Sequence, residues 1–357
     1  MKIRLANIND NQSLLALSRS APMESHLAVN VDRAPDYFQL ANLQGDDALV
    51  FVAEQDGVIA GAIGCCLREV VLLGRKTLIG YIGGIKVAAA ARKGLTSFRL
   101  MSAVADHLRA TPIELAIVIT MENNTAMAPI LVGRLGMPPF HLLGQFNLSY
   151  IWPLFKRKVS GQYLIRPFRE SDLELLAKLF AGFFQNYALT VEWTPARLAA
   201  VLKQPNFGPE NLLIAEKDGR PVAALSFWDQ ADFKQTIVEH YGGWLKTAAG
   251  LLKPFKFLPA EGEPLTELNI RHLVYEDGES RAARALIRFL INEKRPQFRL
   301  FRFGFHQNSR LGILFSGYPR LKIPLNCYLA FKTASENSTA IISALRQGQI
   351  WEDLSLH

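Results

Sequence analysis

The amino-acid sequence predicts an α/β protein, with a mixed sheet of the α+β kind, in which one fold occurs twice in tandem. Length is the first reason, because 357 residues exceed what a single hydrophobic core usually holds. The second reason is the alternation of strand-like apolar runs with helical periods in both halves. The third is an internal repeat, since Ile3-Arg4 recurs as Ile165-Arg166 after 162 positions (165 minus 3).

The repeat includes polar positions as well as apolar ones. Three further features recur at the same spacing: Asp10 and Asp172, Glu54 and Glu216, and the turns Asp56-Gly57 and Asp218-Gly219. We therefore expect a first domain at residues 1–155, a second at 160–333, and a C-terminal helix and tail at 334–357. The polar, basic stretch Lys156-Arg157-Lys158 between the two domains is expected to be a solvated linker.

The local pattern predicts each element of the first domain. In order, we expect a strand at 2–6, a helix at about 13–17, a loop at 20–32, a helix opened by Pro35, strands at 48–54, 58–70 and 81–87, a helix from Leu95, a strand at 114–121, a helix at about 125–135 and a strand at 146–151. Asp56-Gly57 is typical of a two-residue hairpin turn. In the second half, residues 230–264 interrupt the repeat, and we expect this insertion to contain a helix.

Composition limits the function classes. The net charge of +8 is spread evenly: 16 Lys and Arg residues stand against 12 Asp and Glu up to Lys158, and 24 against 20 beyond it. An anionic ligand is therefore compatible, and nucleic-acid binding is not favoured. The N-terminus lacks a signal-peptide pattern, and the longest apolar run, residues 58–67, is too short to span a membrane. Three cysteines without metal-ligand spacing indicate a reducing, cytoplasmic setting and no metal site.

Residues 82–101 organise the first domain, as a strand that enters a helix through the basic turn Arg92-Lys93-Gly94. The first N–H groups of a helix have no partner inside it, and the positive end of the dipole favours an anion. Thr96 and Ser97 add hydroxyl groups there. The turn is therefore a candidate pyrophosphate site, although its sequence also suits an ordinary strand-to-helix turn with two solvated cations. It is neither a P-loop nor a Rossmann motif.

The order of these elements resembles the GNAT family of N-acetyltransferases. Three runs carry the resemblance: Gly83-Gly84-Ile85-Lys86-Val87, Ala91-Arg92-Lys93-Gly94-Leu95-Thr96, and Asn123-Asn124 through Ala128 to Arg134-Leu135-Gly136-Met137. The family signature for acetyl-CoA is Arg/Gln-x-x-Gly-x-Gly/Ala. Here Gly94 matches, while Ala91 stands at the Arg/Gln position and Thr96 at the last small position.

The resemblance implies that acetyl-CoA is a co-substrate and that an amine attacks its thioester. It implies that the strand at 82–87 splays from the strand at 114–121 and binds the pantetheine arm, and that a backbone N–H near residues 85–87 stabilises the oxyanion. The implied cofactor-binding residues are Ile85, Lys86, Val87, Arg92, Lys93, Gly94, Leu95, Thr96, Ser97 and Asn124. Asn124, like Asn123, could instead cap the next helix.

Family members often carry a tyrosine acid in the helix after the fifth strand, but Leu131 or Val132 occupies that position here. Four residues are the candidates for proton transfer: Glu122, Tyr81, Glu24 and His26. Each has a plainer reading, because Glu122 suits solvent or a helix cap and Tyr81 suits the core. Glu24 and His26 suit an exposed loop.

The second copy departs further from the family. Three carboxylates, Glu276, Asp277 and Glu279, open its corresponding helix; they suit helix caps and would repel a pyrophosphate. We expect this copy to have lost cofactor binding and to pack beside the acceptor cleft of the first. The predicted partners are acetyl-CoA and an amine acceptor, with no nucleic acid or membrane, and a homodimer is left open. The alternatives are a non-catalytic acyl-CoA-binding or interaction protein, and a transferase of another acyl or aminoacyl group.

Overall fold

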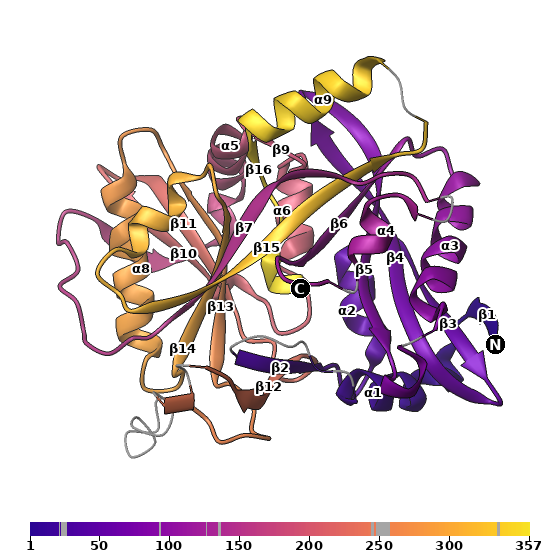
Figure 1. The fold of residues 1–357 in the computed structure, drawn as a ribbon. Coiled ribbons are helices and arrows are strands. Elements are labelled where there is room, and N and C mark those ends of the chain that lie inside the picture. Colours follow the sequence, from indigo (N-terminus) through magenta and orange to yellow (C-terminus); the bar gives the residue numbers. More distant parts are fainter. Residues whose placement is uncertain are drawn as a thin grey trace.

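One sheet of twelve strands passes through both halves of the protein (Figure 1). The structure is a computed structural model that describes residues 1–20, 22, 27–92, 94–125, 127–134, 137–243, 246–247, 258–333 and 336–357. In sheet order the strands are β1 (Lys2–Leu5), β3 (Asp46–Gln55), β4 (Val58–Leu72), β5 (Arg75–Val87), β6 (Leu115–Met121), β15 (Arg320–Phe331), β7 (His141–Ile151), β14 (Leu300–His306), β13 (Glu267–Tyr275), β11 (Arg220–Trp228), β10 (Leu212–Lys217) and β8 (Leu164–Pro167). The predicted α/β class with a mixed sheet is confirmed.

The two halves exchange their last strands at the centre of this sheet. β15 comes from the second half but pairs antiparallel with β6 of the first, from Leu325 opposite Met121 to Phe331 opposite Leu115. β7 comes from the first half but pairs antiparallel with β14 of the second. β7 and β15 also pair with each other, so each half completes the sheet of the other.

Helices pack on both faces of the sheet (Figure 1). The α-helices are α1 (Asn11–Arg19), α2 (Tyr37–Gln44), α3 (Thr96–Arg109), α4 (Ala128–Leu131), α5 (Leu173–Phe184), α6 (Pro195–Val201), α8 (Ser280–Lys294) and α9 (Glu336–Gln347). The short 3-10 helices are η1 (Ile8–Asp10), η2 (Ala89–Ala91), η4 (Glu170–Asp172), η5 (Pro209–Asn211), η7 (Arg310–Phe315) and η8 (Leu354–Leu356). Among the described residues, no helix is long and apolar enough to cross a membrane.

Alternation along the strands assigns the helices of the first half to their faces. β3 places Phe51 and Ala53 in the hydrophobic cluster of α3 and α4. It places Val50 and Val52 in the cluster of α1 and α2, on the opposite face. The strands and long helices predicted for this half are found, and Asp56-Gly57 forms the expected hairpin turn, with both residues at positive φ.

One expectation was wrong and another was incomplete, and one cause explains both. Residues 27–32 are not loop but strand β2 (Leu27–Asp32), and the insertion contains strand β12 (Gln235–Tyr241) besides the helical residues 246–247. These strands pair with each other in a two-stranded ribbon that lies apart from the main sheet. Each needs a partner about 200 residues away, so no local pattern reveals it. Residues 244–245 and 248–257 of the insertion lie outside the described residues.

The same ion-pair network occurs in both halves at the predicted spacing. Arg4 binds Asp10 through two hydrogen bonds of 2.8 Å and Glu54 through one of 2.6 Å. At positions 162 residues later, Arg166 contacts Asp172 and Glu216 in the same way. Each network ties the first strand of its half to the helix that follows and to the second strand of the sheet. The repeated sequence therefore has a repeated structure.

The tail after α9 runs into the interior instead of along the surface. Strand β16 (Gln349–Ile350) pairs with β9 (Tyr187–Ala188), and η8 then lies against β13 and β14 near the middle of the protein (Figure 1). Leu354 and Leu356 are buried. The final residues therefore belong to the centre of the fold.

Candidate active site

Strands β5 and β6 part near the centre of the sheet. They pair in parallel over three residues only, from Gly80 to Ile82, although β5 continues to Val87 and β6 to Met121. The splay that the family resemblance implies is therefore present. Past Ile82, no strand of the described part of the chain lies beside the edge of β5 that faces β6, so the main-chain groups of this edge can pair with an extended ligand.

A bulge in β5 lies at this point. Between Gly83 and Lys86, β5 carries one residue more than the facing stretch of β4. Gly84 accommodates the extra residue with a φ of +64°, which other residues rarely adopt. The bulge turns the main chain of residues 84–85 out of the regular ladder, beside the parting of the strands.

The N-terminus of α3 opens onto a cavity near the end of β5. Its N-cap residue, Leu95, makes no side-chain cap, and among the described residues the first N–H bonded to a carbonyl of this turn is that of Arg99, to Leu95 O at 2.8 Å. The cavity has a volume of about 280 Å³ and is lined by Met1, Gln55, Ala90, Ala91, Gly94, Leu95, Thr96 and Arg99. The first-turn N–H groups of α3 are thus not capped by a side chain of the described residues, which suits an anion.

Three predicted cofactor residues, Gly94, Leu95 and Thr96, line this cavity, and other predicted residues do not. Arg92 turns back to β5, where its Nε donates to Val87 O at 3.1 Å. Ser97 is absent from the lining. Among the described residues, Arg99 is the cation that lines the cavity. Sequence reasoning missed it, although its place in the first turn of the helix was a usable signal.

Two further predicted residues are placed differently or lie outside the description. Asn124 does not cap α4: its Nδ2 donates to Thr120 Oγ1 at 2.9 Å, and Met127 is the N-cap residue. A side chain already satisfied within its own turn has no reason to reach the next helix. Lys93 lies outside the described residues.

Tyr81 begins a buried chain of polar groups beside the parting of the strands. Its hydroxyl lies 3.0 Å from His357 Nδ1, and His357 Nε2 lies 2.9 Å from Glu352 Oε1. Arg68 donates to the same Glu352 oxygen at 2.6 Å and stacks its guanidinium on the Tyr81 ring at 3.8 Å. Sequence reasoning missed Glu352 and His357, because a short tail without periodicity gave no sign that it would enter the core.

Burial and charge decide the protonation states in this chain. Burial raises the pKa of Tyr81, so the phenol is neutral at physiological pH. Burial opposes the charge of Glu352, but Arg68 and His357 outweigh it and hold the pKa of that carboxyl below its usual value. Burial lowers the pKa of His357. A neutral imidazole whose Nε2–H donates to Glu352 leaves Nδ1 as the acceptor for the Tyr81 hydroxyl.

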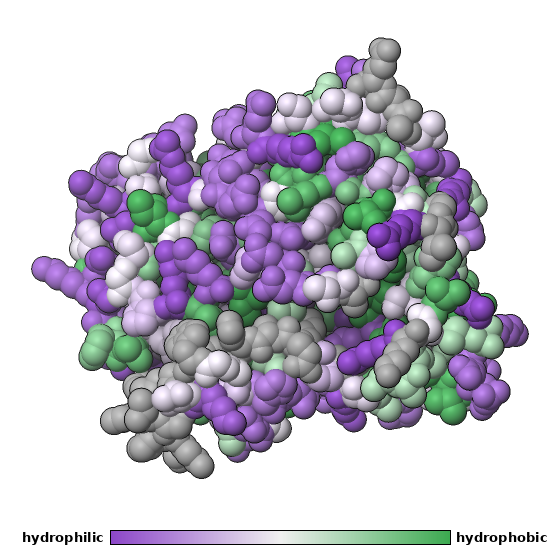
Figure 2. Space-filling model, viewed as in Figure 1, coloured by the Kyte–Doolittle hydropathy of each residue, from purple (hydrophilic) through white to green (hydrophobic). Residues whose placement is uncertain are grey.

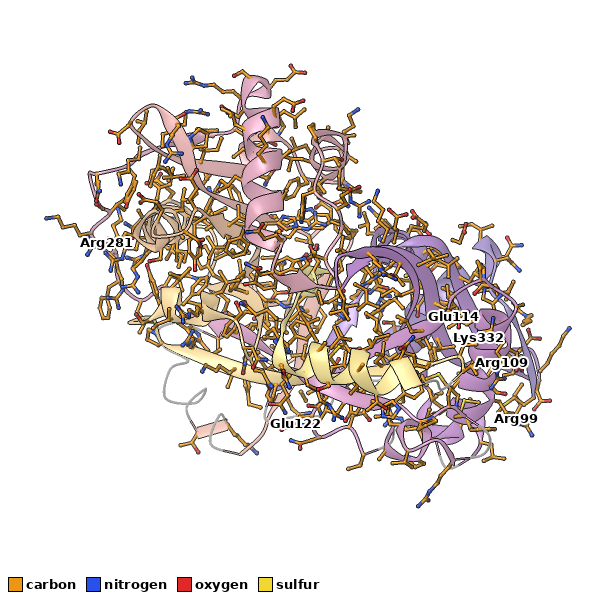
Figure 3. All side chains as sticks on the ribbon, turned by 90° about the horizontal axis from the view of Figure 1, so that it is seen from above. Arg99, Arg109, Glu114, Glu122, Arg281 and Lys332 are labelled. Carbon is orange, nitrogen blue, oxygen red and sulfur yellow. The ribbon has the colours of Figure 1, made fainter. Side chains whose placement is uncertain are left out.

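The other proton-transfer candidates are not joined to Tyr81 in the described structure. Glu122 is exposed just beyond β6 and accepts a hydrogen bond of 2.7 Å from Gln145 Nε2. Figure 3 places it at the periphery of the molecule. Glu24 and His26 lie outside the described residues.

Two cations lie near the bulge of β5. Arg33 stacks over the Tyr37 ring at 4.7 Å, and its Nη2 lies 3.2 Å from where a side chain on Gly84 would begin. Burial first, and then Arg33 and Arg92, lower the pKa of Lys86 to about 8. The predicted site therefore has a positive potential on this side. Sequence reasoning missed Arg33.

In the second half, the corresponding parting of strands is covered by the tail of the chain. β13 and β14 pair from Glu267 to Asn269 only. Beyond this point Leu354 packs closely on Gly304. A Cβ atom added to Gly304 would lie 2.3 Å from Leu354 Cδ1. Arg302 Nη2 donates to the main-chain oxygens of Leu354 and His357 at 3.2 and 2.8 Å.

The carboxylates before α8 do not act as the expected helix caps. Glu279, the N-cap residue, makes no capping bond. Its oxygens instead accept from Lys217 Nζ at 2.5 Å and from the Tyr163 hydroxyl at 2.9 Å. Glu276 accepts from Arg220 at 3.0 Å. Bonds from charged donors are stronger than bonds from neutral backbone N–H groups, which accounts for the difference.

The fold matches solved structures over nearly its full length. The Saccharomyces cerevisiae N-myristoyltransferase with bound myristoyl-CoA matches with a TM-score of 0.62 and 12% identity, over 93% of this chain and 83% of that one. A GCN5-related N-acetyltransferase from Sphaerobacter thermophilus matches with a TM-score of 0.61 and 14% identity, over 94% of this chain and 96% of that one. One from Anabaena variabilis has a TM-score of 0.53 and 11% identity, over 93% of this chain and 73% of that one.

Of the two sequence comparisons, the one with family models points to the same fold. No curated protein sequence matches this chain. The model of the acetyltransferase (GNAT) family matches residues 13–136, which contain the parting strands and α3. Residues 13–136 are therefore similar to the acetyltransferase (GNAT) family, and the chain as a whole has the fold of these acyltransferases.

Proposed function

We propose that this protein transfers an acetyl group from acetyl-CoA to an amine at the parting of β5 and β6. The observation that carries the proposal is the coincidence of two features in the first half. In the described part of the chain, an edge of β5 without a neighbouring strand ends close to a helix whose first turn has no side-chain cap and lies at a cavity of about 280 Å³. An extended thioester arm and a diphosphate need these two features side by side.

The residues present fit the phosphate-bearing end of the co-substrate. Gly94 leaves room for a close approach, because among the described residues a side chain there would meet only Ala91 O, at 3.8 Å. N–H groups of the first turn of α3, Thr96 and Ser97 among them, would donate to the diphosphate, and Arg99 would add a full charge. The arm would then follow β5 from Val87 toward Gly84, where an outward N–H would stabilise the oxyanion.

Tyr81 would move the proton that the amine must lose. A lysine-like amine has a pKa of roughly 10 and is mostly protonated at neutral pH. The Tyr81 hydroxyl would accept that proton as it passes its own to His357 Nδ1, 3.0 Å away. Glu352 stabilises the imidazolium that forms, since it already lies 2.9 Å from Nε2. The thiolate leaving group needs no acid.

The choice of acyl group and acceptor is part of the proposal. One structural neighbour binds myristoyl-CoA and others are named as acetyltransferases, so the acyl chain must be tested by length. The two alternatives are an acyl-CoA-binding protein without catalysis and transfer of an aminoacyl group. Binding of charged tRNA would favour the aminoacyl reaction.

Calorimetry with acetyl-CoA tests the binding site directly. We expect Gly94→Ala to bind within about threefold of the wild type, because the added carbon fits. We expect Gly94→Glu to weaken binding at least about 100-fold, since its carboxylate would enter the diphosphate site. The absence of wild-type binding would overturn the proposal. Binding without CoA release across amines and acyl chain lengths would favour the non-catalytic alternative.

A further inference from the structure

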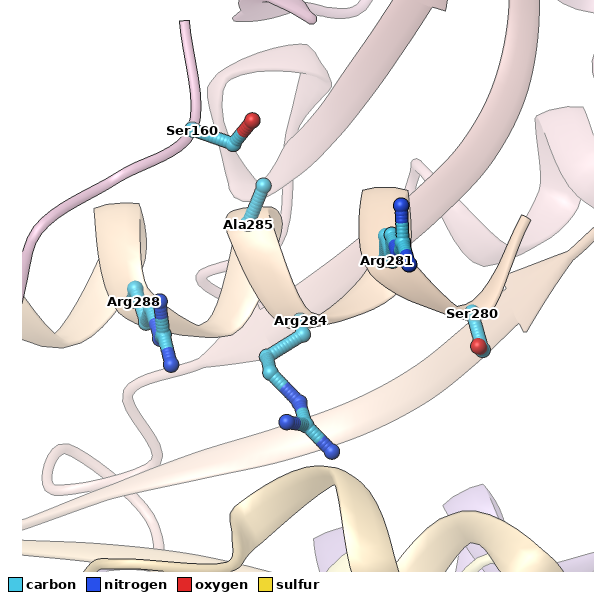
Figure 4. A pocket seen from close by; sticks show the side chains of 6 residues that line it. All are labelled: Ser160, Ser280, Arg281, Arg284, Ala285 and Arg288. Carbon is cyan, nitrogen blue, oxygen red and sulfur yellow. The ribbon is translucent and has the colours of Figure 1, made fainter. Parts of the chain in front are cut away.

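A second cavity lies along α8, at the opposite end of the sheet from α3 (Figures 1 and 3). Its volume is about 400 Å³, which is within the range of small-molecule sites. The lining residues are Ser160, Ser280, Arg281, Arg284, Ala285 and Arg288. Figure 4 shows that five of these six come from the one helix, with Ser160 of the linker beside Ala285.

The three arginines follow one face of the helix. Their spacing of three and then four residues places neighbouring side chains about 5–6 Å apart at Cβ. Arg284 and Arg288 each donate one hydrogen bond to a main-chain carbonyl, Ile313 O at 3.4 Å and Lys158 O at 3.0 Å. Each guanidinium has five N–H donors, so most of them remain for a ligand.

No carboxylate of the part of the chain that the structure describes lines this cavity. Among the described residues, none of the three arginines forms an ion pair. Of the acids that precede α8, Glu276 and Glu279 are paired with Arg220 and Lys217, which direct them elsewhere. Like charges at this spacing destabilise a helix, so folding alone gives no reason to group three cations here.

The linker adds to the positive charge. It packs along α8, where Arg157 N–H donates to Asn292 Oδ1 at 2.9 Å. Arg157 is therefore not solvated as expected, but partly buried against the Tyr318 ring at 4.8 Å. Lys156 and Lys158 remain exposed. Figure 2 shows that the surface seen over this end of the molecule is largely hydrophilic.

We propose that the cavity along α8 binds a small ligand that carries two or more phosphate groups. Arginine matches phosphate because its planar fork donates two parallel hydrogen bonds. Three arginines in a row exceed what one phosphate can contact, and the Ser160 and Ser280 hydroxyls extend the donor set. The tail covers the parting of β13 and β14, so the ligand would not insert a thioester arm there.

Calorimetry with sodium tripolyphosphate and with adenosine 3′,5′-bisphosphate tests this inference on the full chain. The first probe represents inorganic polyphosphate and the second a nucleotide, so their relative affinities identify the source. We expect at least one probe to bind the wild type with micromolar affinity. We expect Arg284→Gln/Arg288→Gln to weaken that binding at least about 30-fold, as expected when two charge-assisted contacts are lost.

Two matched variants isolate the site. Lys178→Gln/Lys203→Gln removes the same charge from exposed positions elsewhere and should bind like the wild type. Gly94→Glu removes any binding of these probes at the proposed acetyl-CoA site and should retain the binding that Arg284→Gln/Arg288→Gln removes, so the two sites are distinguished. The inference is overturned if neither probe binds, if the double arginine variant binds equally well with unchanged circular dichroism, or if sulfate binds as tightly as tripolyphosphate.

Discussion

The two halves of this protein share one frame but differ at the place where their strands part. Each half has the same arginine–carboxylate network and a parallel pair of strands that separates after three residues. In the first half the main chain beyond the parting borders an uncapped helix. In the second, residues of the tail pack on Gly304 and bond to Arg302. A GNAT-like cleft can thus be closed by added chain without any change in the sheet.

The largest expected effect concerns the proton path of the first half. Tyr81→Phe should reduce acetyl transfer about 10²- to 10⁴-fold, because the amine loses its route to His357. As a control, Tyr163→Phe removes a tyrosine hydroxyl of the second half that donates to Glu279. This variant should leave the rate unchanged. Steady-state kinetics with a saturating amine measures both. Equal rates for Tyr81→Phe and wild type would exclude this path.

A smaller effect, on stability, is expected when the side chain that fills the covered cleft of the second half is shortened. Leu354 is 3% exposed, so Leu354→Ala should lower the free energy of unfolding by about 2–5 kcal/mol. Leu95→Ala at the open helix start should cost less than about 0.5 kcal/mol, because Leu95 is 57% exposed. Urea denaturation of both variants gives the comparison. Similar losses for the two would mean that the tail does not seal the second half.

The smallest expected effect is a difference between the two ion-pair networks in their contribution to the free energy of unfolding. The side chains of Arg166 and Asp172 are 12% and 8% exposed, against 27% and 11% for Arg4 and Asp10. Asp172→Asn should therefore cost about 2 kcal/mol and Asp10→Asn about 1 kcal/mol at pH 7. Urea denaturation of both variants measures the difference, and a larger loss for Asp10→Asn would reverse the order.

The pH dependence of these losses follows from the pKa of each carboxyl. Hydrogen bonds from Arg4 and Arg166 lower the pKa values of Asp10 and Asp172 below that of an unfolded aspartate. Their stabilisation is present above the unfolded pKa and is lost as the pH falls through the lowered one. Both variants should therefore approach the wild type in acid. A loss that stays constant between pH 7 and pH 2 would contradict this origin.

Local patterns predicted the elements whose partners are near in sequence. The turn at Asp56-Gly57 and the apolar period of α3 needed no distant information. The repeat identified Arg166, Asp172 and Glu216 as equivalents of Arg4, Asp10 and Glu54, but it did not predict the ion pairs among them. By contrast, β2 and β12 stabilise each other across about 200 residues, and β15 completes a sheet begun in the first half. Pairing over such distances leaves no periodic trace.

The residues of the candidate site also form two groups, those predicted from local sequence and those brought in by distant parts of the chain. Gly94 and Thr96 follow from a turn read locally, and Tyr81 from its strand. Arg33, Glu352 and His357 reach Gly84 or Tyr81 only through tertiary structure. Their distance from these residues in sequence is the reason that no motif included them.

The strand exchange has a consequence for the order in which the protein can be made. During synthesis β6 is complete long before residues 320–331 leave the ribosome, so its outer edge must wait for a neighbour about 200 positions downstream. An unpaired edge invites pairing with other chains. A fragment that ends after β7 would retain that edge, and we expect it to self-associate rather than to behave as an autonomous transferase.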